Sequence, residues 1–380
     1  MRKNKKEEKG KKKCKVWMIV GGIILVLVFA ICLIPKLLFT DYDGLPTTGK
    51  YKVKQESVIF IDEKRLEIFE TDGSNREIPA YFYYPDIEET NGDEFPLVIF
   101  SHGAFGYYQS NTSTYMELAS HGYIVVSLEH PYHSIFTKDT SGKLITVNKK
   151  FMQDVMYVNE ENVSEQEIIE LSHEWLELRM EDMNFVLDSL KSAKEKRELQ
   201  EDVWYLPEES KKENMIHILN ITDTEKIGLM GHSLGGAASV TLGRTREDID
   251  AVINLDGTML GEQFGYDSDS GNYEFYNEAY PVPLLFIGNE PHHLEREKVG
   301  ELYVNNVVLE NAVDCKYTYF VGSGHMNFTD LPLFSPKLAA LLGTGEVDAE
   351  TCIVKMNEII LEYYNCYLKE EGTVIIEEKY

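Results

Sequence analysis

A glycine-rich turn at residues 231–236 contains the serine whose surroundings best suit a nucleophile. The sequence Gly-His-Ser-Leu-Gly-Gly places Ser233 between an apolar run, residues 227–230, and a stretch of small helix-forming residues. A serine hydroxyl is a weak nucleophile until a base removes its proton, and a strand–turn–helix elbow presents such a hydroxyl at the edge of a sheet. Gly231 and Gly235 are expected to allow the strained turn. The spacing is not that of a phosphate-binding loop, so the pattern predicts a nucleophile rather than a simple glycine turn.

The base that would activate this serine is predicted to be His325. It follows the last apolar, strand-like run of the chain and a Gly-Ser-Gly turn, which can aim an imidazole at Ser233. This position satisfies the chain order nucleophile, acid, base. The other histidines lack a strand-end glycine turn at the required point. The neighbouring His292 and His293 fit surface positions better than a metal site.

Two carboxylates lie between the nucleophile and the base, each at the end of an apolar run. Asp256 follows residues 251–255 and precedes Gly257, and Glu290 follows the next apolar run. An acid at either position can hold the imidazole of His325 and stabilise its imidazolium. Asp256 is favoured by its short side chain and its glycine turn, and the residues alone leave Glu290 as the alternative.

The negative charge that develops on an attacked carbonyl oxygen needs donors aimed at it. One is expected from the N–H of Leu234, directly after the serine, and a second from the loop after an early strand. Residues 100–106, Phe-Ser-His-Gly-Ala-Phe-Gly, provide such a loop. Gly103 permits the turn, His102 is part of it, and the N–H of Ala104 is the predicted donor.

Charge is divided unevenly along the chain. Residues 1–15 hold nine Lys or Arg and two Glu, a net charge of +7, so the rest of the chain must carry −34 to give the total of −27. Such an acidic body is repelled by nucleic acid, which argues against a nucleic-acid partner. Acidity of this kind is typical of a solvated surface.

An uncharged stretch of nineteen residues, 16–34, follows the basic segment. As a helix it would be about 28 Å long, close to the roughly 30 Å of a hydrocarbon core. It is longer than the apolar part of a secretory signal and lacks a clear cleavage site, so we expect an uncleaved anchor over residues 16–36. The preceding Lys and Arg predict a cytoplasmic N-terminus, with the chain from about residue 40 outside the cell.

Beyond the anchor, residues 37–50 are expected to be a linker and residues 51–380 the catalytic domain. Three of the five cysteines fall in this domain. Cys352 and Cys366 would lie about 21 Å apart on one predicted helix, too far for a disulfide. No CxxC or clustered His/Cys spacing is present, so we expect neither a disulfide scaffold nor a metal site.

The apolar runs predict an α/β fold. Residues 51–61 and 76–85 alternate as hairpin strands do, whereas later runs are near-continuously apolar, which is typical of parallel strands covered on both faces. These runs are residues 96–103, 123–130, 226–233, 250–256, 282–289 and 317–325. Helices are predicted between them, at residues 112–122, 164–198 and 235–245. The alternation implies a mostly parallel central sheet with helices on both faces.

Three stretches interrupt the alternation. Residues 137–165 and 196–222 are polar or charged and lack strong periodicity, and we expect surface excursions there. Residues 261–281 combine acids with tyrosines, and we expect a loop near the carboxyl edge of the sheet.

Motifs in a familiar order run through residues 45–340. "LVIFSHGAFGYYQS", "GHSLGG", "INLDG" and "GSGHMNFTDLPLF" together resemble the plasma-type (isoform II) platelet-activating factor acetylhydrolases and their bacterial relatives. The resemblance implies an α/β-hydrolase fold without metal or cofactor, with Ser233 as nucleophile, His325 as base and Asp256, rather than Glu290, as acid. Members of the family cleave short or oxidised acyl chains from phospholipids, and many relatives act on simpler esters. The anchor and the polar and acidic insertions do not match the family pattern.

We therefore expect a membrane-anchored extracellular serine esterase that hydrolyses short-chain acyl esters of phospholipids through an acyl-enzyme. Its partners would be a small-molecule or lipid ester and the membrane, and the sequence indicates no oligomeric state. A general carboxylesterase of the cutinase or polyester-hydrolase kind is an alternative. A non-catalytic surface protein with a hydrolase fold is another.

Overall fold

The computed structural model describes residues 36–380 apart from residues 87, 89, 91 and 161. The predicted basic segment and the apolar stretch at residues 16–34 lie outside the described residues. Within the described part of the chain, no helix is long and apolar enough to cross a membrane.

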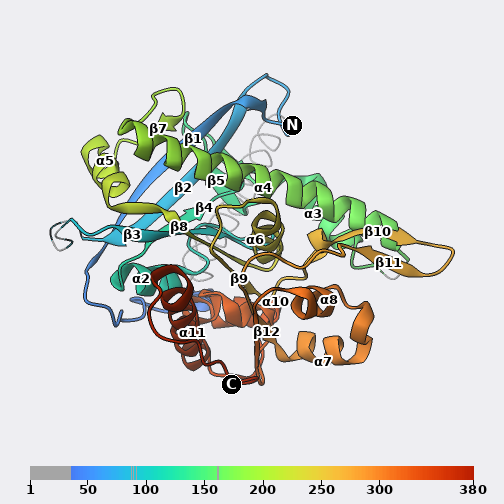
Figure 1. Cartoon of the computed structure of the whole chain (residues 1–380). Coiled ribbons are helices and arrows are strands. Elements are labelled where there is room, and N and C mark those ends of the chain that lie inside the picture. Colours follow the sequence, from blue (N-terminus) through green and yellow to red (C-terminus); the bar gives the residue numbers. More distant parts are fainter. Residues whose placement is uncertain (1–35, 87, 89, 91, 161) are drawn as a thin grey trace, which may run out of the picture.

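A nine-stranded sheet forms the centre of the molecule, in the order β13-β12-β9-β8-β3-β4-β2-β1-β7 (Figure 1). The strands that pair in parallel are β3 (Phe95–Ser101), β4 (Ile124–Leu128), β8 (Thr222–His232), β9 (Ala251–Leu255), β12 (Leu284–Asn289) and β13 (Cys315–Phe320). The hairpin of β1 (Val53–Leu66) and β2 (Asn75–Pro85) joins them antiparallel through β4, and β7 (Trp204–Tyr205) pairs with β1. Each predicted apolar run is therefore a strand of one mostly parallel sheet.

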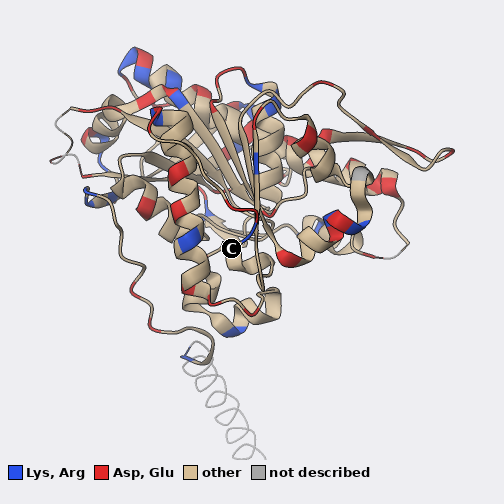
Figure 2. Cartoon of the chain, turned by 60° about the horizontal axis from the view of Figure 1, so that its bottom comes forward, with Lys and Arg blue, Asp and Glu red and all other residues tan. Residues whose placement is uncertain are grey.

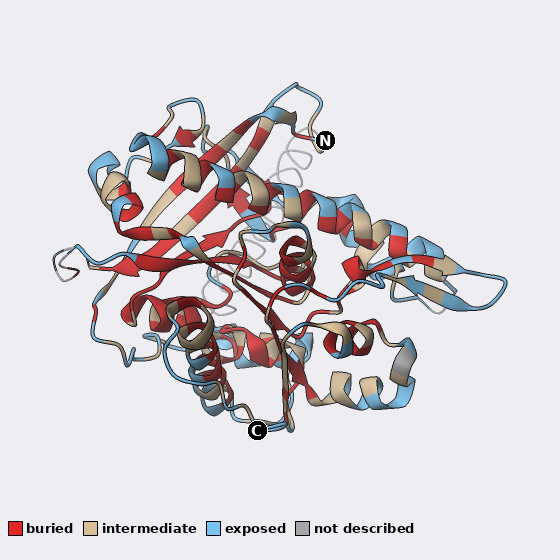
Figure 3. Ribbon diagram, in the orientation of Figure 1, coloured by how far each residue is buried: buried red, intermediate tan, exposed pale blue. Residues whose placement is uncertain are grey.

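Helices cover both faces of the sheet and bury two apolar cores (Figure 3). One core contains residues of α4 (Glu165–Lys196), α5 (Lys212–Ile221), α6 (Leu234–Thr245) and α8 (Val304–Asn311). The other contains residues of α2 (Thr112–Ser120) and α11 (Ala349–Lys369). Strands covered on both faces need apolar side chains in both directions, which explains their near-continuous apolar runs.

Shorter helices follow the last strands of the sheet. They are α7 (Glu290–Val299), η3 (Gly300–Leu302), η4 (His325–Phe328), α9 (Leu331–Phe334) and α10 (Pro336–Leu342). Figure 2 shows acidic residues on helices and loops around the sheet, as the sequence predicts for a solvated acidic surface. Cys352 and Cys366 both lie on α11, and both are free, as is Cys315.

The three irregular stretches contain more regular structure than the sequence predicts. Residues 196–222, expected to be a surface excursion, contain β7 and α5. Around residues 137–165 the chain forms a hairpin of β5 (Phe136–Lys138) and β6 (Leu144–Thr146), then α3 (Lys149–Tyr157). The side chain of Asn148 caps α3 by accepting the N–H groups of its second and third residues.

The expected loop at residues 261–281 is a hairpin instead. After η2 (Leu260–Glu262), β10 (Gln263–Asp267) pairs antiparallel with β11 (Asn272–Phe275). Gly271 has a φ of 74° at its turn, which glycine adopts without strain. Tyr266 of β10 contacts Tyr273 of β11 across the two strands, and Tyr273 also contacts Phe275 two residues along β11. The alternation with acids is therefore a strand pattern.

Candidate active site

Ser233 stands at the elbow between β8 and α6. The strand ends at His232 and the helix begins at Leu234, with Ser233 itself at φ 55° and ψ −123°. This conformation is strained for a non-glycine residue, and the N–H of Ser233 is held by Leu255 O of the neighbouring strand at 2.8 Å. Its side chain is partly exposed, and its Oγ has no hydrogen-bond partner among the described residues. The elbow therefore presents a free hydroxyl at the carboxyl edge of the sheet.

The glycines around Ser233 serve the elbow through close approach rather than through left-handed backbone. A Cβ on Gly231 would lie 2.2 Å from the backbone of Gly235. A Cβ on Gly235 would lie 1.9 Å from Ser101 O, in the strand beside β8. Neither glycine has a positive φ, so the strain of the turn falls on Ser233 itself.

His325 and Asp256 meet directly although 69 residues separate them. The Nδ1 of His325 lies 2.6 Å from Asp256 Oδ2. The Asp256 side chain is fully buried, whereas that of His325 is 34% exposed. Asp256 has a φ of 57°, so a second strained residue ends the strand next to the one that carries Ser233.

The loop that carries His325 lies against the elbow. His232 Nε2 is 3.1 Å from His325 O, and the centroids of the two imidazole rings are 4.5 Å apart. Burial, followed by the neighbouring His325, lowers the pKa of His232 to about 3, so its ring is neutral. With Nδ1 of His325 on Asp256, Nε2 is the ring nitrogen left for a proton from Ser233.

Glu290, the alternative acid, bonds to the backbone of a turn and not to His325. It begins α7, and its Oε2 accepts the N–H of Gly322 at 3.0 Å. It thus supports the turn before His325 without contacting the imidazole. The geometry favours Asp256 as the acid.

His292 contacts the same carboxylate, and the prediction that it is a surface histidine is wrong. Its Nδ1 lies 2.9 Å from Asp256 Oδ1, and its side chain is 28% exposed. Burial by itself lowers the pKa of His292, but the hydrogen bond and charge of Asp256 outweigh it and raise that pKa. A helix-start signal, Asn289 followed by Pro291, places His292 in the first turn of α7 at the edge where Asp256 ends its strand. That signal places His292 just after the end of its strand, but it does not show which carboxylate the imidazole meets.

Four hydrogen bonds converge on Asp256. Besides the two histidines, the backbone N–H of Asn289 donates to Oδ1 at 2.8 Å and its side-chain amide donates to Oδ2 at 2.6 Å. Burial raises the pKa of Asp256, but the bonds from His292 and His325 outweigh it and lower the pKa to about 2. The carboxylate is therefore charged at neutral pH and fixed in orientation.

The predicted oxyanion loop lies beside the nucleophile. A Cβ on Gly103 would be 3.3 Å from the Cβ of Ser233 and 2.9 Å from His232 Nδ1, so glycine at this position also allows the loop to approach the elbow closely. The next N–H, that of Phe105, is bonded to His133 O at 3.1 Å. Over the described chain, the N–H groups of Ala104 and Leu234 have no acceptor, which leaves both free for a substrate oxygen.

The orientation of the Ala104 N–H follows from the peptide that contains it. The carbonyl oxygen of Gly103 accepts bonds from His102 Nδ1 at 2.7 Å and from Arg179 Nη2 at 3.3 Å, on the inner side of the loop. In a trans peptide the C=O and N–H point in opposite directions, so the Ala104 N–H points away from Arg179.

Arg179 of α4 holds this loop from the interior. Its guanidinium also donates to the carbonyl oxygen of His102, and the residue is fully buried. Burial lowers the pKa of Arg179 to about 9, although the negative charges of Asp182 and Glu129 act to raise it. The guanidinium therefore remains charged at neutral pH. Sequence reasoning missed this residue, because nothing in the helical pattern distinguishes it from a surface arginine.

Asp256, His292 and His325 form the group that could offer three metal ligands within the described chain. Their ligand atoms lie within 4.8 Å of one another. The same atoms make the hydrogen bonds that orient His325, so a metal ion bound there would displace those bonds. The arrangement is accounted for by hydrogen bonding around one carboxylate.

The comparison with protein families identifies the group to which this chain is related. The family described as "Platelet-activating factor acetylhydrolase, isoform II" matches residues 66–373. The chain belongs to this family. The resemblance seen in the sequence motifs is thereby confirmed.

Two relatives within the platelet-activating factor acetylhydrolase family show how far the similarity extends. The platelet-activating factor acetylhydrolase of Canis lupus familiaris is 27% identical over 291 residues, and that of Bos taurus is 26% identical over 296 residues. In both cases the match covers 73% of this chain and 58% of the relative. The chain therefore matches little more than half the length of these relatives.

A solved structure supports the fold. A ferulic acid esterase from Streptomyces cinnamoneus superposes with a TM-score of 0.60, over 86% of this chain and 93% of that chain, at 18% identity. At this identity the likeness concerns the fold alone. It agrees with an α/β fold whose central sheet is mostly parallel.

Proposed function

We propose that this protein is a serine hydrolase of carboxylic esters. The observation that carries the proposal is the 2.6 Å contact of His325 with Asp256, on a loop packed against the elbow of Ser233. A serine, a histidine and a buried carboxylate in this relation can generate a nucleophilic alkoxide at neutral pH. Membership of the acetylhydrolase family supports the same reaction class.

The reaction would proceed in two stages. Ser233 Oγ attacks the ester carbonyl while His325 Nε2 takes its proton, and the imidazolium is stabilised by Asp256. The N–H groups of Ala104 and Leu234 bind the oxyanion of the tetrahedral intermediate. His325 then protonates the departing alcohol, and a water molecule activated by the same imidazole hydrolyses the acyl-enzyme.

We further propose a phospholipid ester with a short acyl chain as the substrate. The support is the family and the names of the relatives, which are platelet-activating factor acetylhydrolases. The uncharged residues 16–34 after a basic segment support anchoring in the cell membrane with the catalytic part outside. An enzyme held beside a lipid surface would meet such esters there.

The test is a substrate panel on the full-length chain in detergent. Short-acyl phosphatidylcholines, long-acyl phosphatidylcholines and simple nitrophenyl esters are compared, with headgroup and acyl length varied independently. The proposal expects the highest kcat/KM for short acyl groups on a glycerophospholipid. Equal rates on simple esters would favour a general carboxylesterase instead. Failure of a fluorophosphonate probe to label Ser233 would contradict the hydrolase mechanism and favour a non-catalytic surface protein.

A further inference from the structure

Three buried asparagines surround Asp256, and each bonds either to its carboxylate or to the turn that follows it. Asn254 accepts the N–H of Gly257 at 2.8 Å and donates to the carbonyl oxygen of the same residue at 3.0 Å. Asn305 donates to that carbonyl oxygen at 3.1 Å. These two asparagines fix the backbone after Asp256, whereas Asn289 bonds to the carboxylate itself.

Asn289 ends β12 and caps α7 with the same side chain that reaches the acid. Its Oδ1 accepts the backbone N–H of His292 at 2.7 Å, as the N-cap of a helix does. Its Nδ2 donates to Asp256 Oδ2 at 2.6 Å, and this oxygen is also the one that lies 2.6 Å from His325 Nδ1. The oxygen of an amide accepts and its nitrogen donates, so the cap decides which atom of Asn289 faces the carboxylate.

Helix α7 has no apolar face that could fix its start by itself, because none of its residues is buried. Polar contacts hold its far end, where Asn306 donates to the carbonyl oxygens of Arg296 at 3.1 Å and Gly300 at 2.7 Å. The first turn of α7 and the carboxylate of Asp256 are likewise joined by hydrogen bonds, and Asn289 donates two of them.

The amide of Asn289 orients a carboxylate without compensating its charge. A lysine or arginine at this position could also hold Oδ2 of Asp256, but its positive charge would oppose the formation of an imidazolium on His325. An asparagine amide donates without a net charge, and asparagine is also among the best N-cap residues. One neutral side chain therefore meets both requirements.

We propose that Asn289 is a positioning residue of the ester hydrolysis, which aligns Asp256 with His325 and ties that alignment to the start of α7. The inference rests on the proposed function, because it concerns the acid of that reaction. Asn289 is 3% exposed, so it acts through Asp256 and not on the ester. Loss of alignment in a catalytic group slows the chemical step, and the effect is expected in kcat rather than in KM.

The test compares Asn289→Ser with Asn289→Ala in the full-length chain in detergent, with nitrophenyl acetate as the ester. Serine retains an oxygen for the cap but lacks the amide nitrogen that reaches Asp256, and alanine lacks both. In each variant kcat per folded molecule should fall by about ten- to a hundredfold, with little change in KM. The melting temperature should fall further in Asn289→Ala, so that activity follows the amide and stability follows the cap.

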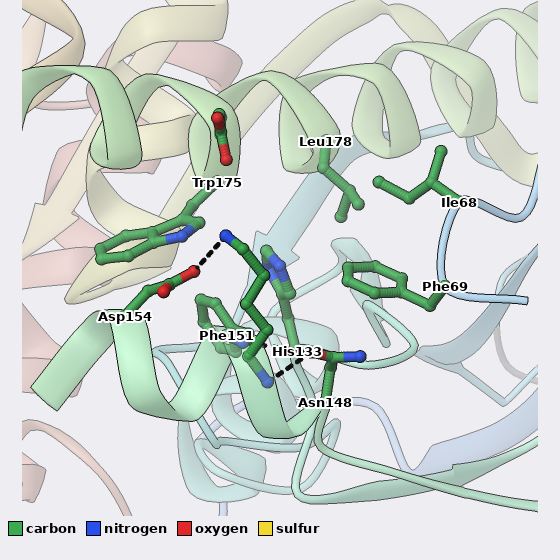
Figure 4. Close-up of a pocket in the computed structure, with 10 residues that line it drawn as sticks. Ile68, Phe69, His133, Asn148, Phe151, Asp154, Trp175 and Leu178 are labelled. Carbon is green, nitrogen blue, oxygen red and sulfur yellow. Dashed lines mark hydrogen bonds and ion pairs between the residues drawn. The ribbon is translucent and has the colours of Figure 1, made fainter. Parts of the chain in front are cut away.

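Two other asparagines provide matched controls, Asn306→Ser and Asn148→Ser. Asn306 is buried and holds the far end of the same helix. Asn148 caps α3 by accepting the N–H of Lys150 at 2.7 Å (Figure 4). Neither asparagine bonds to Asp256 or His325 in the part of the chain that the structure describes. Both controls should lower the melting temperature and leave kcat within about twofold of the wild type.

Asn289→Asp gives a readout that a loss of structure would not produce. The introduced carboxyl can cap α7, but in its ionised form it repels Asp256. In its protonated form it can donate to Asp256 as the amide does. The ratio of its kcat to that of the wild type should therefore rise as the pH is lowered from about 8 to about 6, whereas the ratio for Asn289→Ser should stay constant.

Three outcomes would overturn the role of Asn289. The first is a kcat of Asn289→Ser that stays within about twofold of the two controls. The second is a raised KM with an unchanged kcat, which would place Asn289 in substrate binding. The third is a ratio for Asn289→Asp that does not change with pH. If the wild type itself cleaves no nitrophenyl ester, the proposed function fails, and the role of Asn289 fails with it.

Discussion

Two buried aspartates, Asp256 and Asp182, have similar first neighbours and different surroundings. Each carboxylate is fully buried and each lies against the Nδ1 of a histidine: Asp256 and His325 at 2.6 Å, Asp182 and His130 at 2.9 Å. Burial raises the pKa of both carboxyls and their hydrogen-bonding partners outweigh it, so both pKa values are lowered. By these criteria the two sites look alike.

The charges around the two aspartates differ. Asp182 is paired with the guanidinium groups of Arg76 at 2.7 Å and Arg65 at 2.9 Å, so its negative charge is already compensated. Burial, followed by the charge of Arg179, lowers the pKa of its partner His130 to about 3.

Asp256 has no arginine or lysine among its hydrogen-bonding partners in the described chain; Asn289 and the two histidines supply its bonds. Its negative charge therefore remains available to stabilise an imidazolium on the partly exposed His325. Burial and a histidine partner therefore do not distinguish the two carboxylates, whereas the fixed counter-charges and the exposure of the histidine do.

The largest effect is expected from Ser233→Ala. This substitution removes the hydroxyl that would attack the ester, so kcat for nitrophenyl acetate should fall at least about 10⁴-fold. Circular dichroism should be unchanged, because the Ser233 Oγ makes no hydrogen bond with the described residues. Full retention of activity would mean that Asp256, like Asp182, does not belong to a catalytic site with Ser233.

The second-largest loss of activity is expected from Asp256→Asn. The amide cannot select the required tautomer of His325 or stabilise its charge, and we expect kcat to fall by about 10³- to 10⁴-fold. Glu290→Gln is the matched control at the alternative acid, and it should retain most activity because Glu290 contacts the turn and not the imidazole. The reverse ranking would assign the acid to Glu290.

Asp182→Asn should have its main effect on stability. It leaves the buried guanidinium of Arg76 without its closest carboxylate, and breaking such a pair costs about 3 kcal/mol or more. Urea unfolding should show a lower midpoint, while kcat per folded molecule falls far less than in Asp256→Asn. A variant as stable as the wild type would mean that the Asp182 cluster is not structural.

His292→Gln is expected to have the smallest effect and a specific pH dependence. The folded-state pKa of His292 is raised above its ordinary value of 6.5, so its contribution to stability is fully present below pH 6.5. That contribution is lost as the pH rises through the raised pKa. The melting-temperature difference between wild type and variant should therefore shrink from pH 5.5 to pH 8.5.

His293→Gln controls for the loss of a histidine at the adjacent position. His293 bonds to Tyr317 at 2.9 Å and stacks on Tyr319, away from Asp256. Its Nε2 lies 3.7 Å from Glu297 Oε1, so this variant measures the loss of a histidine whose carboxylate neighbour is not Asp256. The same trend in both variants would show that it does not arise at Asp256.

The sequence indicated the sheet and the site residues because both depend on local rules. Strands covered on both faces require runs such as those of β3 and β9, and an elbow requires glycines around Ser233. The order of Ser233, Asp256 and His325 along the chain then allowed their meeting at one sheet edge to be predicted. Their catalytic role stays a prediction.

Features that depend on neighbours distant in sequence could not be read in this way. Helix α3 buries only Phe151, and that ring meets Trp175 of α4, with centroids 5.5 Å apart, a contact that no local pattern indicates. His292 reaches Asp256 because β9 and β12 are adjacent in the sheet, a pairing no local pattern encodes.

The sequence by itself determined which residues could react and in what order they occur. Only the tertiary structure decided which buried aspartate keeps an uncompensated charge. That depends on the packing of Arg76 and Arg65 against Asp182, 106 and 117 residues away along the chain. Electrostatic environment is set by distance in space, whereas a motif records distance along the chain.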